Sequence, residues 1–564
     1  MHWFRSFYVP LAGGCLVLGV ACGPASTGTT GPAAGAPSKP KVLNIGVSTE
    51  LPVIGVFAGT STGGWTTLTE LHSTGLVTPD AQEPRMTGRL AVSVPSVEDG
   101  SISITPNGQM RVVYRLRHGV TWQDGAPFTA QDLVFTQTFL FDKNLPVVLR
   151  DSAKQVASIE APDDFTAVFT FAQPYSLGGS LGVRDYWPQP RHLLQEPYDR
   201  YQASGSSDEV VNLPYWTSAY VGLGPFRVTT FDPGEGVTMQ AYDGFFLGRP
   251  KVDTVNVRPF RDENTLFANV LAGAIDVFPE PALHPEFADD LKRWEAESLG
   301  TIHTLPGTTS FLAPQWRPEV QKEPANLDVH VRQALYQAID RNAFPPGLVQ
   351  QAWALLPPGH PLYDATKDAL KRYPYDRVRA RALLDEAGWT MAPDGLLRNN
   401  TDGRKFQNRI STVATGRQWE VATYADAWRK VGIETEEALV PAAQSRDLQF
   451  RALYPSWEAS SSAYGDGILG RLTGPAASPE NRWAGNRGGY DDPAAQLLIA
   501  RYYASISDKD QLQVMHELSD LVVSQLPLLI SYYGTYYNGV RKGVTALNDA
   551  YGKQDTSARN SHLW

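Results

Sequence analysis

The stretch MRVVYRLRHGVTWQDGAPFTAQDLVFTQTFL, residues 110–140, decides the fold. From Val112 to Leu116, apolar residues alternate with mostly charged ones, and a period of two places one set on a buried sheet face. Glycines and a proline then predict a tight loop. Thr129 stands three residues before Asp132 at the head of an apolar run, which is typical of a capped helix start. The stretch therefore predicts a strand, a loop and a helix.

The same residues also resemble a family signature. The order Y-R-L-R-x-G-V-x-W-x-D-G-x-P-F-T-A-x-D-L-V-F is similar to that of the peptide/nickel class of extracellular solute-binding proteins. These proteins are receptors of ATP-driven (ABC) importers and include oligopeptide- and dipeptide-binding lipoproteins. In that family the motif is architectural and does not hold the ligand. Further similar stretches, among them N-R-G-G-Y-D-D-P at residues 486–493, extend the resemblance from about residue 42 to the C-terminus.

The resemblance implies an α/β, two-lobed periplasmic-binding-protein fold with two crossing segments and an extra inserted subdomain in the first lobe. The crossing segments are expected near residues 303–316 and 522–535. The expected domain limits are 42–63, 220–303 and 535–564 for the first-lobe core, 64–219 for the inserted subdomain, and 304–534 for the second lobe with its hinge segments.

Some elements are predicted from the residues alone. An apolar run at residues 42–47 predicts the first strand, and Asp262, Asp328 and Asp376 each precede an expected helix as its cap. Residues 526–530 predict a short buried strand. The proline within it indicates an edge strand or a strand start.

Length and composition restrict the function classes. With 564 residues the chain is too long for one core, so two or three domains are expected. It carries 59 acidic and 49 basic side chains, a net charge of −10, which does not suggest a nucleic-acid partner but is compatible with a local basic patch. The ten His are scattered, without an H-x-x-x-H pair or a Cys/His cluster. No metal or cofactor is expected.

The N-terminal residues predict export. Residues 1–21 have an apolar run that is too short and too interrupted for a membrane span, and they indicate a signal peptide. The sequence LGVACG, residues 18–23, resembles a bacterial lipoprotein cleavage box in which Cys22 becomes the lipid anchor. An ordinary signal peptide cut nearby is the alternative. Residues 22–41 are rich in Gly, Pro, Ser and Thr and predict a flexible tether after the anchor.

The resemblance implies a monomeric, extracytoplasmic, lipid-anchored receptor. It would capture a peptide or another polar solute between two lobes and deliver it to a membrane-embedded ABC permease. An oligosaccharide-binding member of the family and a sensory receptor without a transport partner are alternatives. A third alternative is a secreted serine hydrolase built around Ser61 in G-T-S-T-G, residues 59–63. We expect no enzyme, because only a strand or two precede this motif.

One ligand contact of the family departs from its pattern here. In its oligopeptide binders, an Asp three residues after a Trp pairs with the α-ammonium of the peptide. The similar stretch here contains Trp457 and places Ser460 at the anchor position. A neutral hydroxyl cannot replace a carboxylate for a buried ammonium, whose unpaired burial costs several kcal/mol. Glu458 or Asp466 are the alternative acids, and otherwise the peptide assignment weakens.

Aromatic residues are the other candidate ligand contacts. Trp457, Tyr464 and Trp483 lie in the same region and would suit the apolar or sugar-like face of a solute. Trp65, in the loop after the first strand, is a candidate for lining the cleft. For each tryptophan, packing in a hydrophobic core is the alternative interpretation.

Overall fold

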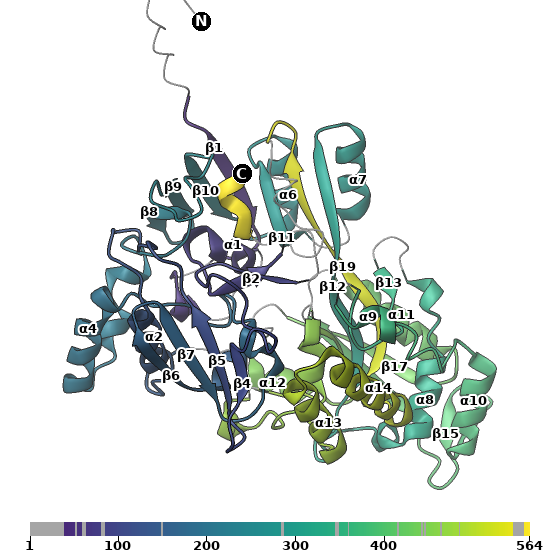
Figure 1. Ribbon diagram of the computed structural model, residues 1–564. Coiled ribbons are helices and arrows are strands. Elements are labelled where there is room, and N and C mark those ends of the chain that lie inside the picture. Colours follow the sequence, from purple (N-terminus) through teal and green to yellow (C-terminus); the bar gives the residue numbers. More distant parts are fainter. Residues whose placement is uncertain are drawn as a thin grey trace, which may run out of the picture. The chain divides into compact units, whose positions relative to one another are not determined.

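The decisive stretch forms a strand, a loop and a helix in the computed structural model (Figure 1), as predicted. Strand β5 (Met110–Arg115) is followed by helix α2 (Ala130–Leu140), and Thr129 and Asp132 form a capping box at the helix start. Asp132 is buried, and its carboxylate accepts hydrogen bonds from the Thr129 N–H at 2.9 Å and the Arg191 N–H at 3.0 Å. Since Arg191 begins another helix, this aspartate joins two helices, which is an architectural role.

The structure describes residues 39–564 except 51–52, 59–63, 81–84, 148–150, 284–286, 345–348, 359, 414–416, 442–443, 445–446, 463–464, 484 and 545–557. Residues 41–564 form one unit. In the described ranges no helix has the length and apolar character needed to cross a membrane. The predicted signal peptide, Cys22, Ser61 and Tyr464 lie outside the described residues.

The largest sheet has 11 strands, drawn from distant parts of the described chain. Its hydrogen-bonded order is β17 (Glu434–Val440), β16 (Gln407–Val413), β18 (Trp457–Ser462), β12 (Gly300–Pro314), β19 (Leu529–Arg541), β11 (Val277–Leu283), β1 (Val42–Val47), β10 (Thr254–Pro259), β9 (Gly236–Ala241) and β8 (Phe226–Asp232), with β13 (Val349–Gln351) pairing beside β19. We call the side with β11, β1 and β10 the first lobe and the side with β16, β17 and β18 the second lobe.

Two long antiparallel strands, β12 and β19, belong to both lobes and lie side by side (Figure 1). They pair from Gly300 with Arg541 to Leu312 with Leu529. β19 also pairs with β11 of the first lobe, and β12 also pairs with β18 of the second. The predicted crossing segments overlap these strands. The register shifts between Pro306 and Thr308 and again after Ser310, which are irregularities typical of a local bend.

The structure corrects the prediction of a short strand at residues 526–530. β19 is 13 residues long rather than short, and it lies in the middle of the sheet rather than at an edge. The proline stands before the first strand residue, so the alternative of a strand start is confirmed. The prediction was too short because the crossing strand continues through a run of tyrosines and glycines with no simple alternation.

A second sheet of four strands lies within the predicted inserted subdomain, whose limits stay a prediction. Its order is β4 (Ile102–Ile104), β5, β7 (Thr166–Phe171) and β6 (Val156–Asp163). Two small hairpins complete the described strands: β2 (Val77–Pro79) with β3 (Met86–Gly88), and β14 (Trp389–Met391) with β15 (Leu397–Asn399).

The helices of the first lobe and its insertion are α1 (Trp65–His72), α2, α3 (Asp151–Lys154), α4 (Arg191–Ser204), α5 (Asp208–Val211), α6 (Glu263–Leu271) and α7 (Ala288–Ala296). Those of the second lobe are α8 (Val329–Gln337), α9 (Tyr363–Thr366), α10 (Arg377–Glu386), α11 (Gln418–Arg429), α12 (Leu448–Ala452), α13 (Pro493–Ala504) and α14 (Asp508–Gln525). Short 3₁₀ helices are η1 (Val56–Ala58), η2 (Ser176–Gly179), η3 (Pro214–Trp216), η5 (Pro324–Leu327), η6 (Arg341–Ala343), η8 (Gly465–Arg471), η9 (Pro479–Asn481) and η10 (Ala558–Leu563).

The predicted caps are confirmed. The Asp262 carboxylate accepts from the Thr265 N–H of α6, that of Asp328 accepts from the second residue of α8, and that of Asp376 accepts from the third residue of α10. A side-chain acceptor at this position satisfies an N–H that the helix cannot pair internally and contributes about 1 kcal/mol. These local signals therefore determine where the helices begin.

The sheet of the second lobe separates two hydrophobic clusters. Leu312, Trp457 and Ala459 pack in one cluster with side chains of α8, α10 and α11. Phe311 and Ala313, on the opposite face, pack in the other with side chains of η8, α13 and α14. Because neighbours along a strand point to opposite faces, each residue of β18 faces one cluster or the other.

Candidate ligand-binding site

Strand β18 carries the residues that were predicted to meet the ligand. It runs antiparallel to β12, with Ser460 opposite Phe311 and Glu458 opposite Ala313. Directly opposed residues share a face of a sheet. Ser460 and Glu458 therefore point towards η8, α13 and α14, whereas Trp457 points the other way.

Trp457 occupies the core of the second lobe. Its side chain is fully buried, and its ring lies 5.2 Å from that of Trp428 in an edge-on arrangement. It presents no ring surface to a solute in this structure. The alternation along β18 explains this position, because the face that carries Trp457 is covered by helices α8, α10 and α11.

Trp65 is also a buried core residue. It begins α1 and packs in the first-lobe cluster that includes Leu43 and Ile45 of β1. Its Nε1–H donates to the carbonyl oxygen of Thr49, so the polar edge of the ring is satisfied within the lobe. Like Trp457, Trp65 offers no free ring face in this structure.

Trp483 differs from both of these tryptophans because its side chain is only half-buried. Its φ angle is 61° and that of the preceding Arg482 is 55°, so two consecutive non-glycine residues adopt the left-handed conformation. Each such residue costs about 1–2 kcal/mol, and backbone strain of this kind gathers at ligand-binding segments. Trp483 therefore stays a candidate ligand contact.

Glu458 is not available to a ligand ammonium. Arg451 donates to its Oε1 from Nε at 3.0 Å and also from Nη2, while Nη2 of Arg487 lies 3.1 Å from its Oε2. Burial opposes the charged carboxylate, but the positive charges of Arg487 and Arg451 outweigh burial and lower the pKa of Glu458. In this geometry the carboxylate of Glu458 is already paired with two arginines, and its replacement of the missing anchor acid stays an untested alternative.

Ser460 is paired with a cation rather than open to one. It is buried, and its Oγ accepts a hydrogen bond from Arg487 Nη2 at 2.9 Å. The turn at residues 486–493 holds this arginine in place. A Cβ atom at Gly488 would lie 2.9 Å from the Tyr454 hydroxyl, so the close approach requires glycine, and the Gly488 carbonyl accepts from the Trp316 N–H at 2.8 Å.

Arg471, the last residue of η8, completes the cluster. Its guanidinium lies 5.9 Å from the centre of the Phe311 ring, and among the described residues it makes no hydrogen bond or ion pair. Burial, reinforced by the like charge of Arg487, lowers its pKa to about 10, so Arg471 is still charged at neutral pH. We call Glu458, Arg451, Arg471 and Arg487 the arginine cluster.

A small cavity borders the arginine cluster. Its volume is about 10 Å³, which is room for one water-sized group. It is lined by Arg471, Arg487, Glu458, Phe311, Trp316 and Tyr490, among others. Polar and aromatic groups therefore converge next to Ser460.

Asp466, the other alternative acid, has partners of its own. Its Oδ1 lies 2.8 Å from His360 Nε2 and accepts from the Tyr502 hydroxyl at 3.3 Å. These contacts connect η8 to the segment before α9 and to α13. They give Asp466 a structural role in this conformation rather than a free carboxylate.

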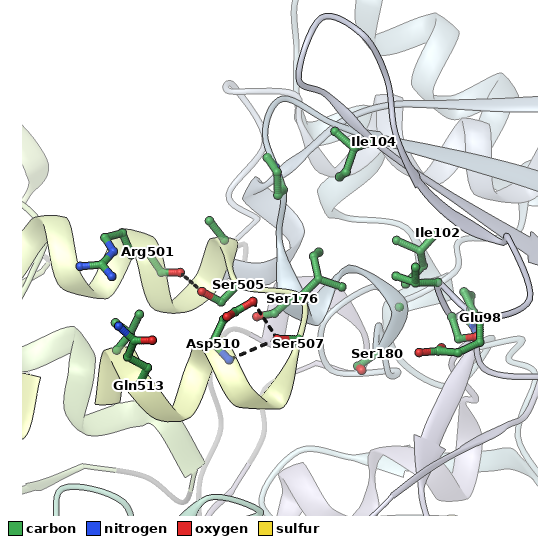
Figure 2. Close-up of a pocket in the computed structure, with 18 residues that line it drawn as sticks. Glu98, Ile102, Ile104, Ser176, Ser180, Arg501, Ser505, Ser507, Asp510 and Gln513 are labelled. Carbon is green, nitrogen blue, oxygen red and sulfur yellow. Dashed lines mark hydrogen bonds between the residues drawn. The ribbon is translucent and has the colours of Figure 1, made fainter. Parts of the chain in front are cut away.

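A larger cavity of about 850 Å³ lies between the inserted subdomain and the turn from α13 to α14 (Figure 2). Glu98, Ile102 and Ser176 line one side, and Arg501 and Asp510 line the other. The hydrogen bonds drawn there stay within the α13–α14 segment. The cavity therefore lies between the lobes, and polar side chains such as Glu98, Ser176, Arg501 and Asp510 line it from both sides.

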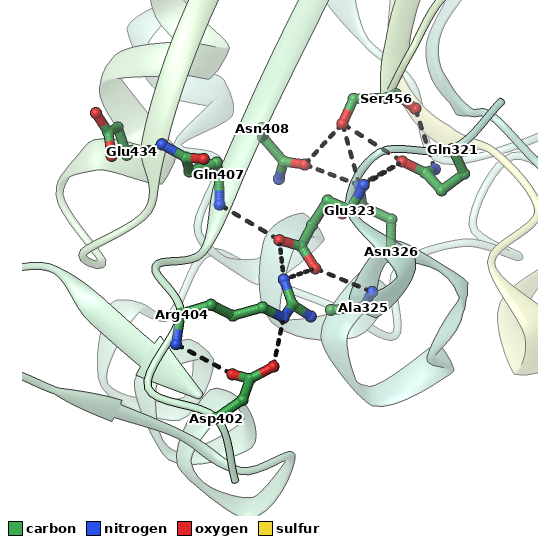
Figure 3. A network of polar contacts seen from close by, with 10 residues as sticks. All are labelled: Gln321, Glu323, Ala325, Asn326, Asp402, Arg404, Gln407, Asn408, Glu434 and Ser456. Carbon is green, nitrogen blue, oxygen red and sulfur yellow. Dashed lines mark hydrogen bonds and ion pairs between the residues drawn. The ribbon is translucent and has the colours of Figure 1, made fainter. Parts of the chain in front are cut away.

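The second lobe also contains a buried polar network (Figure 3). Glu323 accepts two hydrogen bonds from Nη1 of Arg404, at 2.9 and 2.7 Å, and further ones from the Ala325 and Gln407 N–H groups. Ser456 and Asn408 continue the network in Figure 3. It joins the loop before α8 to the strand β16, and its buried carboxylate, that of Glu323, is paired with the Arg404 guanidinium.

Arg451, Arg471 and Arg487 were not predicted from the sequence. They come from a helix, a 3₁₀ helix and a turn, so no spacing relates them to Ser460. The predicted turn at residues 486–493 was the one available signal, and it indicated a structural role. Across the described ranges, no three His, Cys, Asp or Glu side chains gather closely enough to hold a metal ion.

Comparisons with known proteins agree with the fold. The oligopeptide-binding protein AppA of Bacillus subtilis is 24% identical over 370 residues, which cover 63% of this chain and 64% of AppA, slightly under two thirds of that relative. The solved oligopeptide-binding protein of Thermus thermophilus, complexed with a pentapeptide, has 21% identity and a TM-score of 0.74 over 92% of this chain and 95% of its own. NikZ of Campylobacter jejuni, in complex with Ni(L-His), has 18% identity and a TM-score of 0.73 over 93% and 99%.

These structural likenesses show the two-lobed α/β fold. A family model described as bacterial extracellular solute-binding proteins, family 5 Middle, matches residues 101–478. This match covers more than half of the chain and includes the strand–loop–helix motif and β18. The chain therefore belongs to family 5 of the bacterial extracellular solute-binding proteins.

Proposed function

We propose that this protein is an extracytoplasmic receptor that captures a polar solute between its two lobes and delivers it to a membrane-embedded ABC permease. The family match over residues 101–478 is the observation that carries the proposal. The shared strands β12 and β19 support it, since their register shifts provide places where the lobes can bend towards each other. A related protein, AppA, is named as an oligopeptide-binding protein.

The site geometry argues against an ordinary peptide N-terminus as the main contact. At Ser460 a guanidinium already donates to the hydroxyl, and Glu458 is held by two arginines. An ammonium would meet like charge there. We therefore propose a solute whose contacts include Ser460 and the half-buried ring of Trp483.

Solute capture should change the shape of the protein. Small-angle scattering should give a smaller radius of gyration after addition of the solute that is released from purified, denatured protein and identified by mass spectrometry. Binding to the closed form should also raise the unfolding temperature with solute concentration. If the recovered solute binds and leaves the radius unchanged, the hinge-closing receptor is contradicted.

The proposal includes a lipid anchor at Cys22, which lies outside the described residues. Replacing Cys22 by Ser should move the protein from the membrane fraction to the soluble fraction, because no acyl chain can then be attached. A matched Cys15→Ser variant should fractionate like the wild type. Membrane association that survives Cys22→Ser would contradict the anchor.

Binding without catalysis completes the proposal, in keeping with a family of binding proteins. A serine-directed phosphonate probe tests the hydrolase alternative at Ser61. The expected result is no labelling at this residue, and specific labelling there would contradict a purely binding role.

A further inference from the structure

The arginine cluster has more positive than negative charge. Among the described residues it holds three guanidinium groups, those of Arg451, Arg471 and Arg487, and one carboxylate, that of Glu458, which leaves an excess of two positive charges. Glu458 is buried, the side chains of Arg451 and Arg487 are 12% and 17% exposed, and Arg471 is partly buried. Burying a charge without a partner costs several kcal/mol, so this excess requires an explanation.

The hydrogen-bond donors in the cluster are not all in use. Arg451 is committed to Glu458, and Arg487 is shared between Glu458 and Ser460. The Nε–H of Arg487 is buried without a partner, and Arg471 makes no hydrogen bond or ion pair among the described residues. An oxygen anion that reaches this point would satisfy donors that the protein itself leaves unpaired.

The cavity beside the cluster limits what can enter. At about 10 Å³ it admits one water-sized group, so a single oxygen atom of an acidic group fits and the other atoms of that group lie outside it. Arg471 and Arg487 line this cavity from two different elements, together with the rings of Trp316 and Tyr490. The arrangement suits a terminal acidic group, with the rest of the solute outside.

The excess of positive charge is confined to the arginine cluster and is not a property of the whole protein. The chain carries a net charge of −10, so its overall field repels anions. A group of partly buried arginines that one carboxylate neutralises only in part is consistent, in such a chain, with short-range recognition of one anionic group. It does not resemble a general basic surface.

We propose that Arg471 and Arg487 bind an acidic group, a carboxylate or a phosphate, of the captured solute. This inference rests on the proposed receptor function and names the charge class of its solute. Ser460 would share the Arg487 donor, and Glu458 would hold Arg451 and Arg487 in place. An acidic solute would thus bring the missing negative charge and complete the cluster.

Sulfate is a suitable probe, because it presents anionic oxygens and can be compared with chloride at equal ionic strength. The thermal midpoint of the full chain should rise more in sulfate than in chloride. Part of this rise is a general salting effect that all variants share. The specific part should disappear in Arg471→Gln, with an apparent sulfate affinity about tenfold weaker, which corresponds to one charge-assisted hydrogen bond.

Two further variants keep the test selective. Arg471→Lys retains the charge and should keep part of the sulfate response. Arg379→Gln removes an exposed arginine of α10 that pairs with Glu386 at 2.9 Å, and it should respond like the wild type. An equal sulfate response in the wild type and in Arg471→Gln would overturn the inference.

The solute recovered from the purified protein provides a second test of the inference. A carboxylate- or phosphate-bearing solute, held more weakly by Arg471→Gln, is the expected result. A neutral or cationic solute that closes the lobes would overturn this inference and leave the receptor function standing. A bound solute that leaves the radius of gyration unchanged would contradict the receptor function, independently of the thermal response to sulfate.

Discussion

Glu323 and Glu458 are both buried carboxylates of the second lobe, with side chains 3% and 5% exposed, but their surroundings differ. Glu323 faces one guanidinium, that of Arg404, which also lies 3.4 Å from Asp402 (Figure 3). Two backbone N–H groups complete its shell. Glu458 instead faces an excess of guanidinium groups.

This difference separates a structural network from a candidate binding site. The Glu323 carboxylate has its counter-charge in Arg404, and the network connects elements of one lobe. Its buried atoms without a partner among the described residues, Asn326 Oδ1 and Asn408 Nδ2, are neutral amide atoms. The arginine cluster lacks negative charge and borders a cavity. Two carboxylates of equal burial therefore have different roles, and the number of opposing charges distinguishes them.

Removing the carboxylate of Glu323 or of Glu458 should reveal the largest difference between the two regions, as a difference in the free energy of unfolding. Glu458→Gln leaves the arginine cluster without an anion, and breaking buried ion pairs in this way should lower the free energy of unfolding by about 3–5 kcal/mol. Glu323→Gln should cost only about 1–3 kcal/mol, because Arg404 is 39% exposed and keeps Asp402. Urea unfolding of both variants measures the difference, and equal losses would contradict the distinction.

A new carboxylate should have opposite consequences in the two regions. Ser456→Asp places a charge among Asn408, Asn326 and Gln321, whose side chains are neutral amides, and should cost about 3 kcal/mol. Ser460→Asp should fold well, because Arg487 is already 2.9 Å from the hydroxyl and would pair with the carboxylate.

The same Ser460→Asp variant should weaken the sulfate response about tenfold, since it neutralises one anion-binding arginine. It should not bind peptides through their N-terminus. Isothermal titration with a tripeptide and its N-acetylated form checks this. Affinity that depends on the free ammonium would show that Arg487 does not occupy the position next to Ser460.

The smallest expected effect is a change, on acidification, in the difference in unfolding free energy between the wild type and Glu458→Gln. The pKa of Glu458 is lowered in the folded protein, so its charged form stabilises the fold above the unfolded value of 4.5, and this stability is lost as the pH falls through the folded pKa. The gap in unfolding free energy between the wild type and Glu458→Gln should therefore narrow below pH 4.5. A gap that stays constant on acidification would show that the Glu458 charge contributes no stability.

Local signals in the sequence were sufficient for much of the fold. The alternation from Val112 to Leu116 and the Thr129–Asp132 spacing act within one strand and one helix turn, so they are readable without the tertiary structure. The site was not readable in this way. Whether Trp457 or Glu458 faces the core depends on which helices cover each side of β18. Likewise, Arg487 reaches Ser460 from 27 residues further along the chain.

The sharing of β12 and β19 has a consequence for how such proteins diversify. β19 is hydrogen-bonded to β11 of the first lobe, β12 to β18 of the second, and the two strands to each other, so neither lobe has a complete sheet of its own. Recombination that exchanged one lobe for that of a relative would join mismatched halves of two long strands and expose unpaired edges. Substitutions on β18 and in the segments beside it, where Ser460 and the surrounding arginines lie, can change the site without breaking these strands.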